Sequence, residues 1–277
     1  MENTWEKNYE YKNEFEYRID NMISLLNLNN ITSVMDLGCG MQTLKNKIPK
    51  SIKYIGVDLY KHVDSTIQID FNKGEFYNEN VDIIFCSGIF EYIYNLESFI
   101  ENITKNTNII IGSYNFIEDA QIRPDIWVNS YNINDFINLW NNFNYKLLFI
   151  SKWEYFNHPI LKNKTNRIFI LINNNDYNYN MINYNKISEI NLQSTIIKQN
   201  EEIKNINIKL DNLINTISWW IPMRKWRDNF RNKMLNTDQT RPDQTRPNYC
   251  ICNDYIYFYH NSKYKKLQPI LQYKIAV

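Results

Sequence analysis

The chain has 277 residues and 44% hydrophobic content, enough for one full α/β domain and an extension. Lys and Arg number 31 against 30 Asp and Glu, so no net field draws the whole chain to a nucleic acid backbone or an anionic membrane. Its apolar runs fall short of the ~20 residues that cross a bilayer, and its first residues lack the pattern of a secretory signal. The four cysteines, Cys39, Cys86, Cys250 and Cys252, form no CxxC pair, so we expect a cytoplasmic protein with reduced cysteines, no metal site and no nucleic-acid partner.

Residues 1–175 carry the pattern of an α/β domain. Short β-branched runs alternate with amphipathic stretches, which is typical of βαβ units around a parallel sheet. We expect helices at Glu14–Leu26, Thr43–Ile48, Leu96–Thr104 and Asn134–Phe143. We expect strands at Ser33–Leu37, Tyr54–Asp58, Thr66–Ile69, Asp82–Cys86, Asn108–Gly112, Tyr145–Trp153 and Arg167–Ile172. The fold class is therefore α/β, a Rossmann-like, seven-stranded, mostly parallel sheet with flanking helices.

The chain changes character after this domain. Residues 176–186 are rich in Asn and Tyr and are interpreted as a linker, and residues 187–235 as a helical extension. From Glu189 to Trp220 a heptad pattern has two seam positions, one with Ile196, Ile203, Leu210 and Ile217, the other with Leu192, Ile206, Leu213 and Trp220. This pattern favours a coiled coil that makes a homo-oligomer, and the alternative is an amphipathic helix docked on its own domain.

The end of the chain combines a basic aromatic segment with a repeat. In Trp219–Arg231, aromatic and basic residues alternate, a combination suited to peripheral contact with the inner membrane or to a polyanion. The alternative is a short helix that packs its tryptophans on the globular domain. Residues 236–277 contain a tandem Asp-Gln-Thr-Arg-Pro repeat and are predicted to be disordered.

The informative motif is the run Val34–Gly40. It is an apolar strand with Asp36 near its end, followed by the glycine pair Gly38 and Gly40. Glycines at the turn after a strand allow positive φ and let a ligand approach the backbone. In a doubly wound sheet, such a turn lies at the ligand-binding edge, outside the carboxyl ends of the strands. A dinucleotide fingerprint needs a third glycine, and Gln42 stands close to where it would be, so nicotinamide binding is disfavoured.

This run resembles the first motif of the class I S-adenosylmethionine-dependent methyltransferases, and the resemblance covers about residues 30–175. It implies S-adenosylmethionine as the cofactor, with Asp58 on the ribose hydroxyls, Asp70 on the adenine amino group, and Ile69 or Phe71 over the adenine ring. It departs from the family at Gln42, where a glycine is usual, and at Tyr92, where His is frequent. The cofactor-binding residues that it implies are Asp36, Gly38, Cys39, Gly40, Asp58, Leu59, Asp70, Phe71 and Ser87.

Methyl transfer mainly requires alignment of the two reactants in a dry site, with a base where the acceptor loses a proton. The candidate bases are Asp119 and His158, each with the alternative of a surface or loop contact. Aromatic residues of Trp127–Tyr131, with Trp153 and Tyr155, are suited either to stacking on a sugar or to core packing, and Arg123 suits a phosphate. By similarity to bacterial surface-polysaccharide methyltransferases, the chain is expected to O-methylate a small-molecule or glycan acceptor, with or without a phosphate group, in capsular or other cell-surface polysaccharide biosynthesis. The alternative is a degenerate methyltransferase fold that acts as a coiled-coil scaffold.

Overall fold

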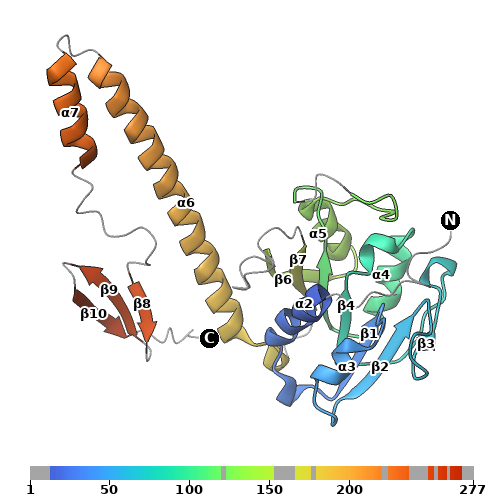
Figure 1. The fold of residues 1–277 in the computed structure, drawn as a ribbon. Helices are drawn as coiled ribbons and strands as arrows, with labels where there is room; N and C mark the ends of the chain where they lie inside the picture. The colour runs from blue at the N-terminus through green and yellow to red at the C-terminus, as the bar shows by residue number, and fades with distance from the viewer. Residues whose placement is uncertain are drawn as a thin grey trace. The chain divides into compact units, whose positions relative to one another are not determined.

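A computed structural model describes residues 13–119, 123–152, 166–175, 179–219, 224–236, 249–252, 255–260 and 263–269. The chain divides into two compact units, residues 1–198 and 199–277, and the boundary falls inside a long helix, α6 (Figure 1). Each unit has its own secondary structure.

The first unit is built on a seven-stranded sheet in the order β3-β2-β1-β4-β5-β7-β6. Neighbouring strands among β1 to β5 pair in parallel, and β7 runs antiparallel to both β5 and β6. The predicted seven-stranded, mostly parallel sheet is therefore confirmed, and every strand ends within two residues of its predicted bounds. The strands are β1 (Ser33–Leu37), β2 (Lys53–Asp58), β3 (Ile67–Gln68), β4 (Ile83–Ser87), β5 (Ile109–Tyr114), β6 (Tyr145–Lys152) and β7 (Arg167–Asn173).

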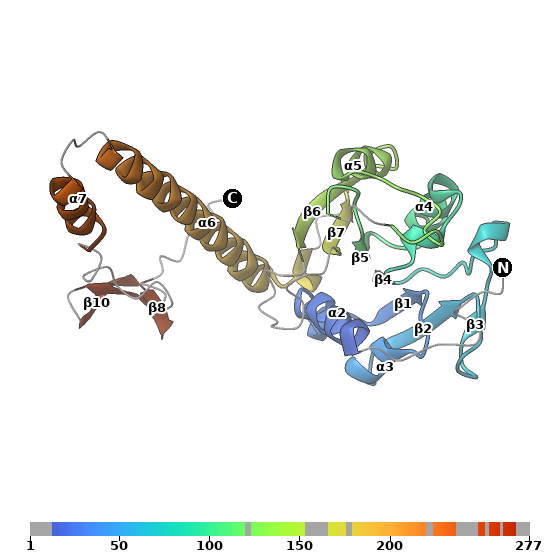
Figure 2. The ribbon, with the colours of Figure 1, turned by 45° about the horizontal axis from the view of Figure 1, so that its top comes forward.

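Both faces of the sheet are buried, which explains the continuous apolar runs in its central strands. Side chains alternate between faces along a strand, so Ile83 and Phe85 join one core cluster while Ile84 joins the other. The first cluster includes residues of helices α2 (Asn13–Ser24) and α3 (Thr43–Lys47), and the second includes residues of α4 (Leu96–Thr104) and α5 (Ile133–Asn141). Figure 2 shows these two pairs of helices on opposite sides of the sheet.

Asparagine side chains set the starts of the two helices in the second layer. Asn95 precedes α4 and accepts a hydrogen bond from the Ser98 N–H at 3.1 Å. Asn132 precedes α5 and accepts from the Asp135 N–H at 2.8 Å. These caps satisfy donors that the first turn of a helix leaves without intrahelical partners.

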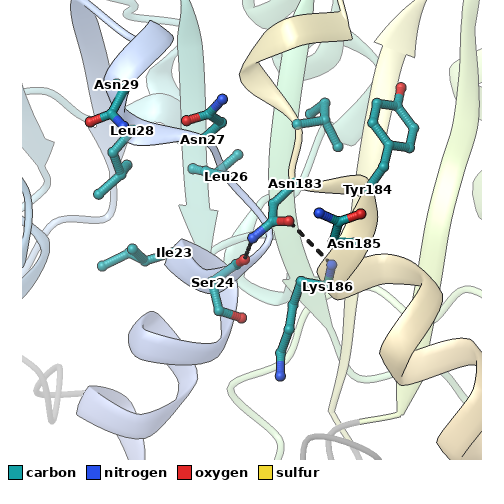
Figure 3. Close-up of a pocket in the computed structure, with 11 residues that line it drawn as sticks. Ile23, Ser24, Leu26, Asn27, Leu28, Asn29, Asn183, Tyr184, Asn185 and Lys186 are labelled. Carbon is teal, nitrogen blue, oxygen red and sulfur yellow. Dashed lines mark hydrogen bonds between the residues drawn. The ribbon is translucent and has the colours of Figure 1, made fainter. Parts of the chain in front are cut away.

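The expected linker over residues 176–186 is tied to the first unit where the structure describes it. A 3₁₀ turn (Tyr179–Met181) is followed by a β-bridge between Ile182 and Leu26, and α6 begins at Tyr184, earlier than predicted. Figure 3 shows Asn183 in a shallow pocket, where its side chain donates to the Ser24 carbonyl at 3.0 Å and accepts from the Lys186 N–H at 3.2 Å. This pocket lies beside residues that precede β1, whereas the ligand-binding edge of such a sheet follows the strands. We therefore interpret it as the docking point of α6.

The second unit contains the rest of α6 (Tyr184–Trp219), helix α7 (Arg224–Asn236) and a three-stranded antiparallel sheet of β8 (Tyr249–Cys252), β9 (Tyr255–His260) and β10 (Lys263–Pro269). These strands lie within residues 236–277, where the sequence analysis expects a disordered tail. In the sequence of β9, Tyr255, Tyr257 and Tyr259 alternate with Ile256 and Phe258, a period of two that is typical of a strand. The repeat itself, residues 237–248, lies outside the described part of the chain.

The predicted helix over the heptad region is present as 36 residues of α6. Six of its seam residues are 42–63% exposed: Leu192, Ile203, Ile206, Leu210, Leu213 and Ile217. The last residue of the predicted seam, Trp220, lies outside the described residues. No helix in the described ranges is long and apolar enough to cross a membrane.

Candidate functional site

The glycine turn after β1 lies against the carboxyl end of β2. The Gly40 N–H donates to Asp58 Oδ2 at 2.8 Å, and Asp58 Oδ1 accepts from the Tyr60 N–H at 3.1 Å. Gly38 and Gly40 have φ of +73° and +49°, backbone conformations that side chains disfavour. A Cβ at Gly38 would lie 2.8 Å from the Cδ1 atom of Ile89, in the loop after β4. The turns after β1, β2 and β4 are thus held together, with the Asp58 carboxylate among them.

Asp36 lies beneath this turn and is 4% exposed. The Tyr54 hydroxyl on β2 donates to Asp36 Oδ2 at 2.8 Å. The pKa of Asp36 is raised to about 7, chiefly by burial and in part by the charge of Asp58, while the Tyr54 hydrogen bond opposes the rise. Asp36 was predicted to bind the cofactor. Its position suits it better to support the turn.

Asp70 follows β3 near the same edge. The Ile69 N–H donates to the Asp58 carbonyl at 2.9 Å, so the chain after β3 runs directly beside the end of β2. The Asp70 carboxylate accepts from the Asn72 N–H at 3.1 Å and pairs with Lys73 at 3.3 Å. Asp70 therefore also caps the short turn that follows it.

Two neighbours of these aspartates have structural contacts. The ring centroid of Phe71 lies 5.0 Å from that of Phe99 on α4, so Phe71 packs against the core under that helix. The Leu59 carbonyl, next to Asp58, accepts from the Gln68 side chain at 3.1 Å. Of the residues suggested to cover an adenine ring, Phe71 therefore has a packing role that the motif did not reveal.

Gln42, the departure from the glycine pattern, holds a left-handed conformation with φ of +56°. Its side chain is 2% exposed, donates to the Thr66 hydroxyl at 3.0 Å, and accepts from the Ser65 hydroxyl at 2.9 Å. The left-handed conformation costs a non-glycine residue about 1–2 kcal/mol. These hydrogen bonds offset the cost, so the turn keeps its shape without the third glycine.

An arginine that the sequence did not single out lies at the end of β4. Arg18 on α2 donates to Ser87 Oγ at 2.7 Å and to the Ser87 carbonyl at 2.9 Å. Gly88 has φ of +73°, and a Cβ there would lie 2.7 Å from the Arg18 guanidinium. Salt bridges from Lys47 to Glu16 and Asp20, at 2.8 and 2.7 Å, fasten α2 to the neighbouring helix α3. A positive charge is thus fixed beside Ser87.

A buried carboxyl follows in the next loop. Glu91 is 1% exposed, and its Oε1 accepts from the N–H and the side-chain amide of Asn115 at 2.9 and 2.8 Å. Its other oxygen, Oε2, has no hydrogen-bond partner among the described residues. Burial raises the pKa of Glu91, while the Asn115 hydrogen bonds and the charge of Arg18 oppose the rise. An orphaned buried carboxyl oxygen is costly, and such groups are frequent at functional sites.

Aromatic residues belong to the two segments that meet at Glu91, where the Val128 N–H donates to the Glu91 carbonyl at 2.9 Å. The Trp127 indole donates to the Tyr92 hydroxyl at 3.3 Å, and the Arg123 guanidinium lies 4.8 Å from the centre of the Trp127 ring. Arg123 also donates to the carbonyls of Asn115 and Asn129, so part of its hydrogen-bonding capacity is used inside the protein. The loops that follow β1, β4 and β5 also carry exposed large hydrophobic side chains: Met41, Tyr94, Ile117 and Ile126.

Of the two predicted catalytic residues, the structure describes Asp119. The side chain of Asp119 is 7% exposed and forms an ion pair with Arg167 on β7, with a second contact to Lys152 at 3.4 Å. His158, like Trp153 and Tyr155, lies outside the described residues. Within the described ranges, no three His, Cys, Asp or Glu side chains gather in a way that suits a metal ion.

The cysteines of the site region are buried thiols. Cys39 in the glycine turn and Cys86 on β4 are both free and buried. Burial raises the pKa of each, and the charge of Asp36 raises it further. Both thiols are therefore neutral side chains at pH 7, and the predicted cofactor contact of Cys39 rests on its backbone.

No protein-family model and no curated protein matches the sequence. Solved structures resemble it. Mitomycin 7-O-methyltransferase aligns at 10% identity and a TM-score of 0.43, over 58% of this chain and 54% of its own, so this chain spans about half of that protein. An S-adenosylmethionine-dependent methyltransferase from Clostridium acetobutylicum aligns at 14% identity and 0.43, over 60% of this chain and 93% of its own. One from Mesorhizobium loti aligns at 10% identity and 0.46, over 56% of this chain and 97% of its own.

Proposed function

We propose that the first unit binds S-adenosylmethionine beside the turns after β1, β2 and β4 and transfers its methyl group to a small-molecule or glycan acceptor. The observation that carries this proposal is the 2.8 Å hydrogen bond between the Gly40 N–H and Asp58 Oδ2. It joins a positive-φ glycine turn to a carboxylate at the carboxyl ends of two adjacent parallel strands. Ligands of open α/β sheets bind at this edge.

The residues present fit the parts of this cofactor. Carboxylate oxygens accept several hydrogen bonds, so Asp58 would take the ribose hydroxyls, and Asp70 with Ile69 would lie on the adenine side. Gly38 and Gly40 would let the cofactor approach the backbone, while Arg18 beside Ser87 would supply a cation for the methionine carboxylate. When bound, S-adenosylmethionine supplies a methyl carbon already activated by a sulfonium.

The proton of the acceptor needs a destination when the nucleophile is a hydroxyl. Glu91 Oε2 is the best described candidate, because Asn115 fixes the carboxyl and leaves this oxygen without a partner in the described residues. Asp119 and His158 remain proposals. For Asp119, the ion pair with Arg167 favours a structural role.

Calorimetric titration with S-adenosylmethionine tests the cofactor proposal. Wild-type protein is expected to bind, and Asp58→Ala is expected to weaken binding by about a hundredfold, since two charge-assisted hydrogen bonds are lost. Asp64→Ala is the matched control, because Asp64 is exposed in the loop between β2 and β3. No binding by the wild type favours the scaffold alternative, and equal binding by Asp58→Ala contradicts the ribose assignment.

The acceptor proposal is O-methylation of a glycan, as in capsular or other cell-surface polysaccharide biosynthesis. It is supported by the aromatic side chains of Trp127 and Tyr92 near the buried Glu91, which suit stacking on a sugar. A screen of nucleotide-activated sugars and glycan fragments with labelled cofactor tests it. Transfer only to apolar aromatic alcohols would contradict the glycan assignment and leave the methyl-transfer proposal intact.

We also propose that Glu189–Trp220 forms a coiled coil between copies of the chain. The support is the heptad seam together with its exposure, 63% for Ile206 and 55% for Leu213. Light scattering of Ile206→Lys/Leu213→Lys is expected to give a monomer, whereas wild type gives an oligomer. Ile208→Lys is the control, since Ile208 is 50% exposed off the seam. A monomeric wild type would contradict the proposal.

A further inference from the structure

Helix α7 concentrates positive charge. Its 13 residues include five Lys or Arg and one Asp, a net charge of +4. The rest of the chain has 31 minus 5, or 26, basic residues and 30 minus 1, or 29, acidic residues, a net charge of −3. A short basic segment on an otherwise acidic chain produces a local field that the near-neutral total conceals.

The same helix exposes apolar side chains. Trp226 is 63% exposed and Met234 is 43% exposed, while Phe230 between them is partly buried. Residues four apart lie on the same side of a helix, so these three follow one face. Arg224, Lys225 and Lys233 are also exposed.

Arg231, next to Phe230 in α7, ties the helix to α6 within the same unit. The Arg231 guanidinium donates to the Ser218 hydroxyl near the end of α6 at 3.0 Å, and Ser218 is fully buried. Ile214, one turn earlier on α6, is 6% exposed. This contact with α6 orients α7, and Trp226 and Met234 keep 63% and 43% of their surface exposed.

We propose that the exposed face of α7 docks on an anionic lipid surface, with Trp226 and Met234 in the interface and the Lys and Arg side chains at the lipid phosphates. An interfacial helix combines an apolar face with a basic polar face and low overall hydrophobicity, as α7 does. Trp226 and Met234 together favour lipid over nucleic acid, because indole rings are enriched at the membrane interface and a phosphate backbone makes no use of the Met234 side chain. Such docking would hold the enzyme beside acceptors attached to lipid.

Vesicle co-sedimentation of the full chain tests the proposal. Vesicles with one quarter anionic lipid are expected to bind the protein, purely zwitterionic vesicles are not, and 0.5 M salt weakens the binding. Each basic residue removed near an anionic surface weakens binding about fivefold, so Arg224→Gln/Lys225→Gln/Lys233→Gln is expected to lose on the order of a hundredfold. Trp226→Ala is expected to lose on the order of tenfold through its lost apolar area.

Matched controls separate α7 from the rest of the surface. Lys50→Gln/Lys61→Gln/Lys146→Gln removes the same charge from exposed positions of the first unit, and Tyr94→Ala removes a 75% exposed aromatic ring there. Both are expected to bind vesicles like wild type, and circular dichroism checks that each variant keeps its helices. Failure of wild type to bind anionic vesicles overturns the proposal. A second result also overturns it: the protein binds a single-stranded RNA as tightly as it binds anionic vesicles, and Trp226→Ala weakens neither interaction. That result would identify a general polyanion site.

Discussion

Asp36→Asn is expected to change how the free energy of unfolding depends on pH. The pKa of Asp36 rises from its ordinary value of 3.8 to about 7 in the folded protein, because the carboxyl is buried and close to Asp58. Between these two values the folded state binds the proton more tightly than the unfolded state, so stability falls as the pH rises. The loss is complete once the pH exceeds about 7, where both states are ionised.

The size of the effect follows from this shift. One pKa unit corresponds to about 1.4 kcal/mol, so the loss between pH 5 and pH 8 amounts to about 2–3 kcal/mol. Asn cannot ionise, and its side-chain oxygen can still accept the Tyr54 hydroxyl hydrogen bond. The free energy of unfolding of Asp36→Asn, minus that of wild type, is therefore expected to rise by about 2–3 kcal/mol from pH 5 to pH 8.

Urea unfolding followed by circular dichroism at pH 5, 6, 7 and 8 measures this difference. Subtracting wild type cancels the other carboxyls, including Asp82, whose pKa is lowered chiefly by hydrogen bonds from Thr32 and Ser33 against its desolvation. Asp64→Asn, at an exposed position, is the control and is expected to follow wild type. A difference between Asp36→Asn and wild type that stays constant over this range would refute the reasoning.

Three further outcomes are expected. Gly112→Ala on β5 places a Cβ 2.5 Å from the Phe169 ring and is expected to lower the free energy of unfolding by about 1–3 kcal/mol in urea titration. Asp119→Asn breaks the ion pair with Arg167 and is expected to lower the free energy of unfolding by about 2–3 kcal/mol. Cofactor affinity in calorimetry is expected to stay unchanged. Unchanged stability with a loss of methyl transfer would instead make Asp119 catalytic. Glu91→Gln keeps the shape of the side chain but cannot accept a proton, so transfer to the acceptor found in the screen is expected to fall about a hundredfold, and an unchanged rate excludes Glu91 as the base.

The element pattern was readable from the sequence because it depends on local periodicity. Continuous apolar runs such as Ile109–Ile111 predict strands covered on both faces, and α4 was predicted with its observed bounds. The glycine turn and Asp58 were also readable, since their spacing in a βαβ unit brings them to one edge of the sheet. The apolar seam of α6 was readable as well, because a heptad repeat places its apolar residues along one side of a helix.

Tertiary structure alone decided which side chains meet at that edge. Arg18 reaches Ser87 across 69 positions of sequence, and no local pattern distinguishes it from other helical arginines. The αL turn at Gln42 is held by a hydrogen bond to Thr66, and the buried Glu91 is held by Asn115 from another strand end. The spacing of apolar residues determines which side chains face the core, and this spacing can be read from the sequence because it involves residues only a few positions apart. The partner of a buried polar group is determined by long-range packing, because its burial is favourable only where the fold brings a donor to it.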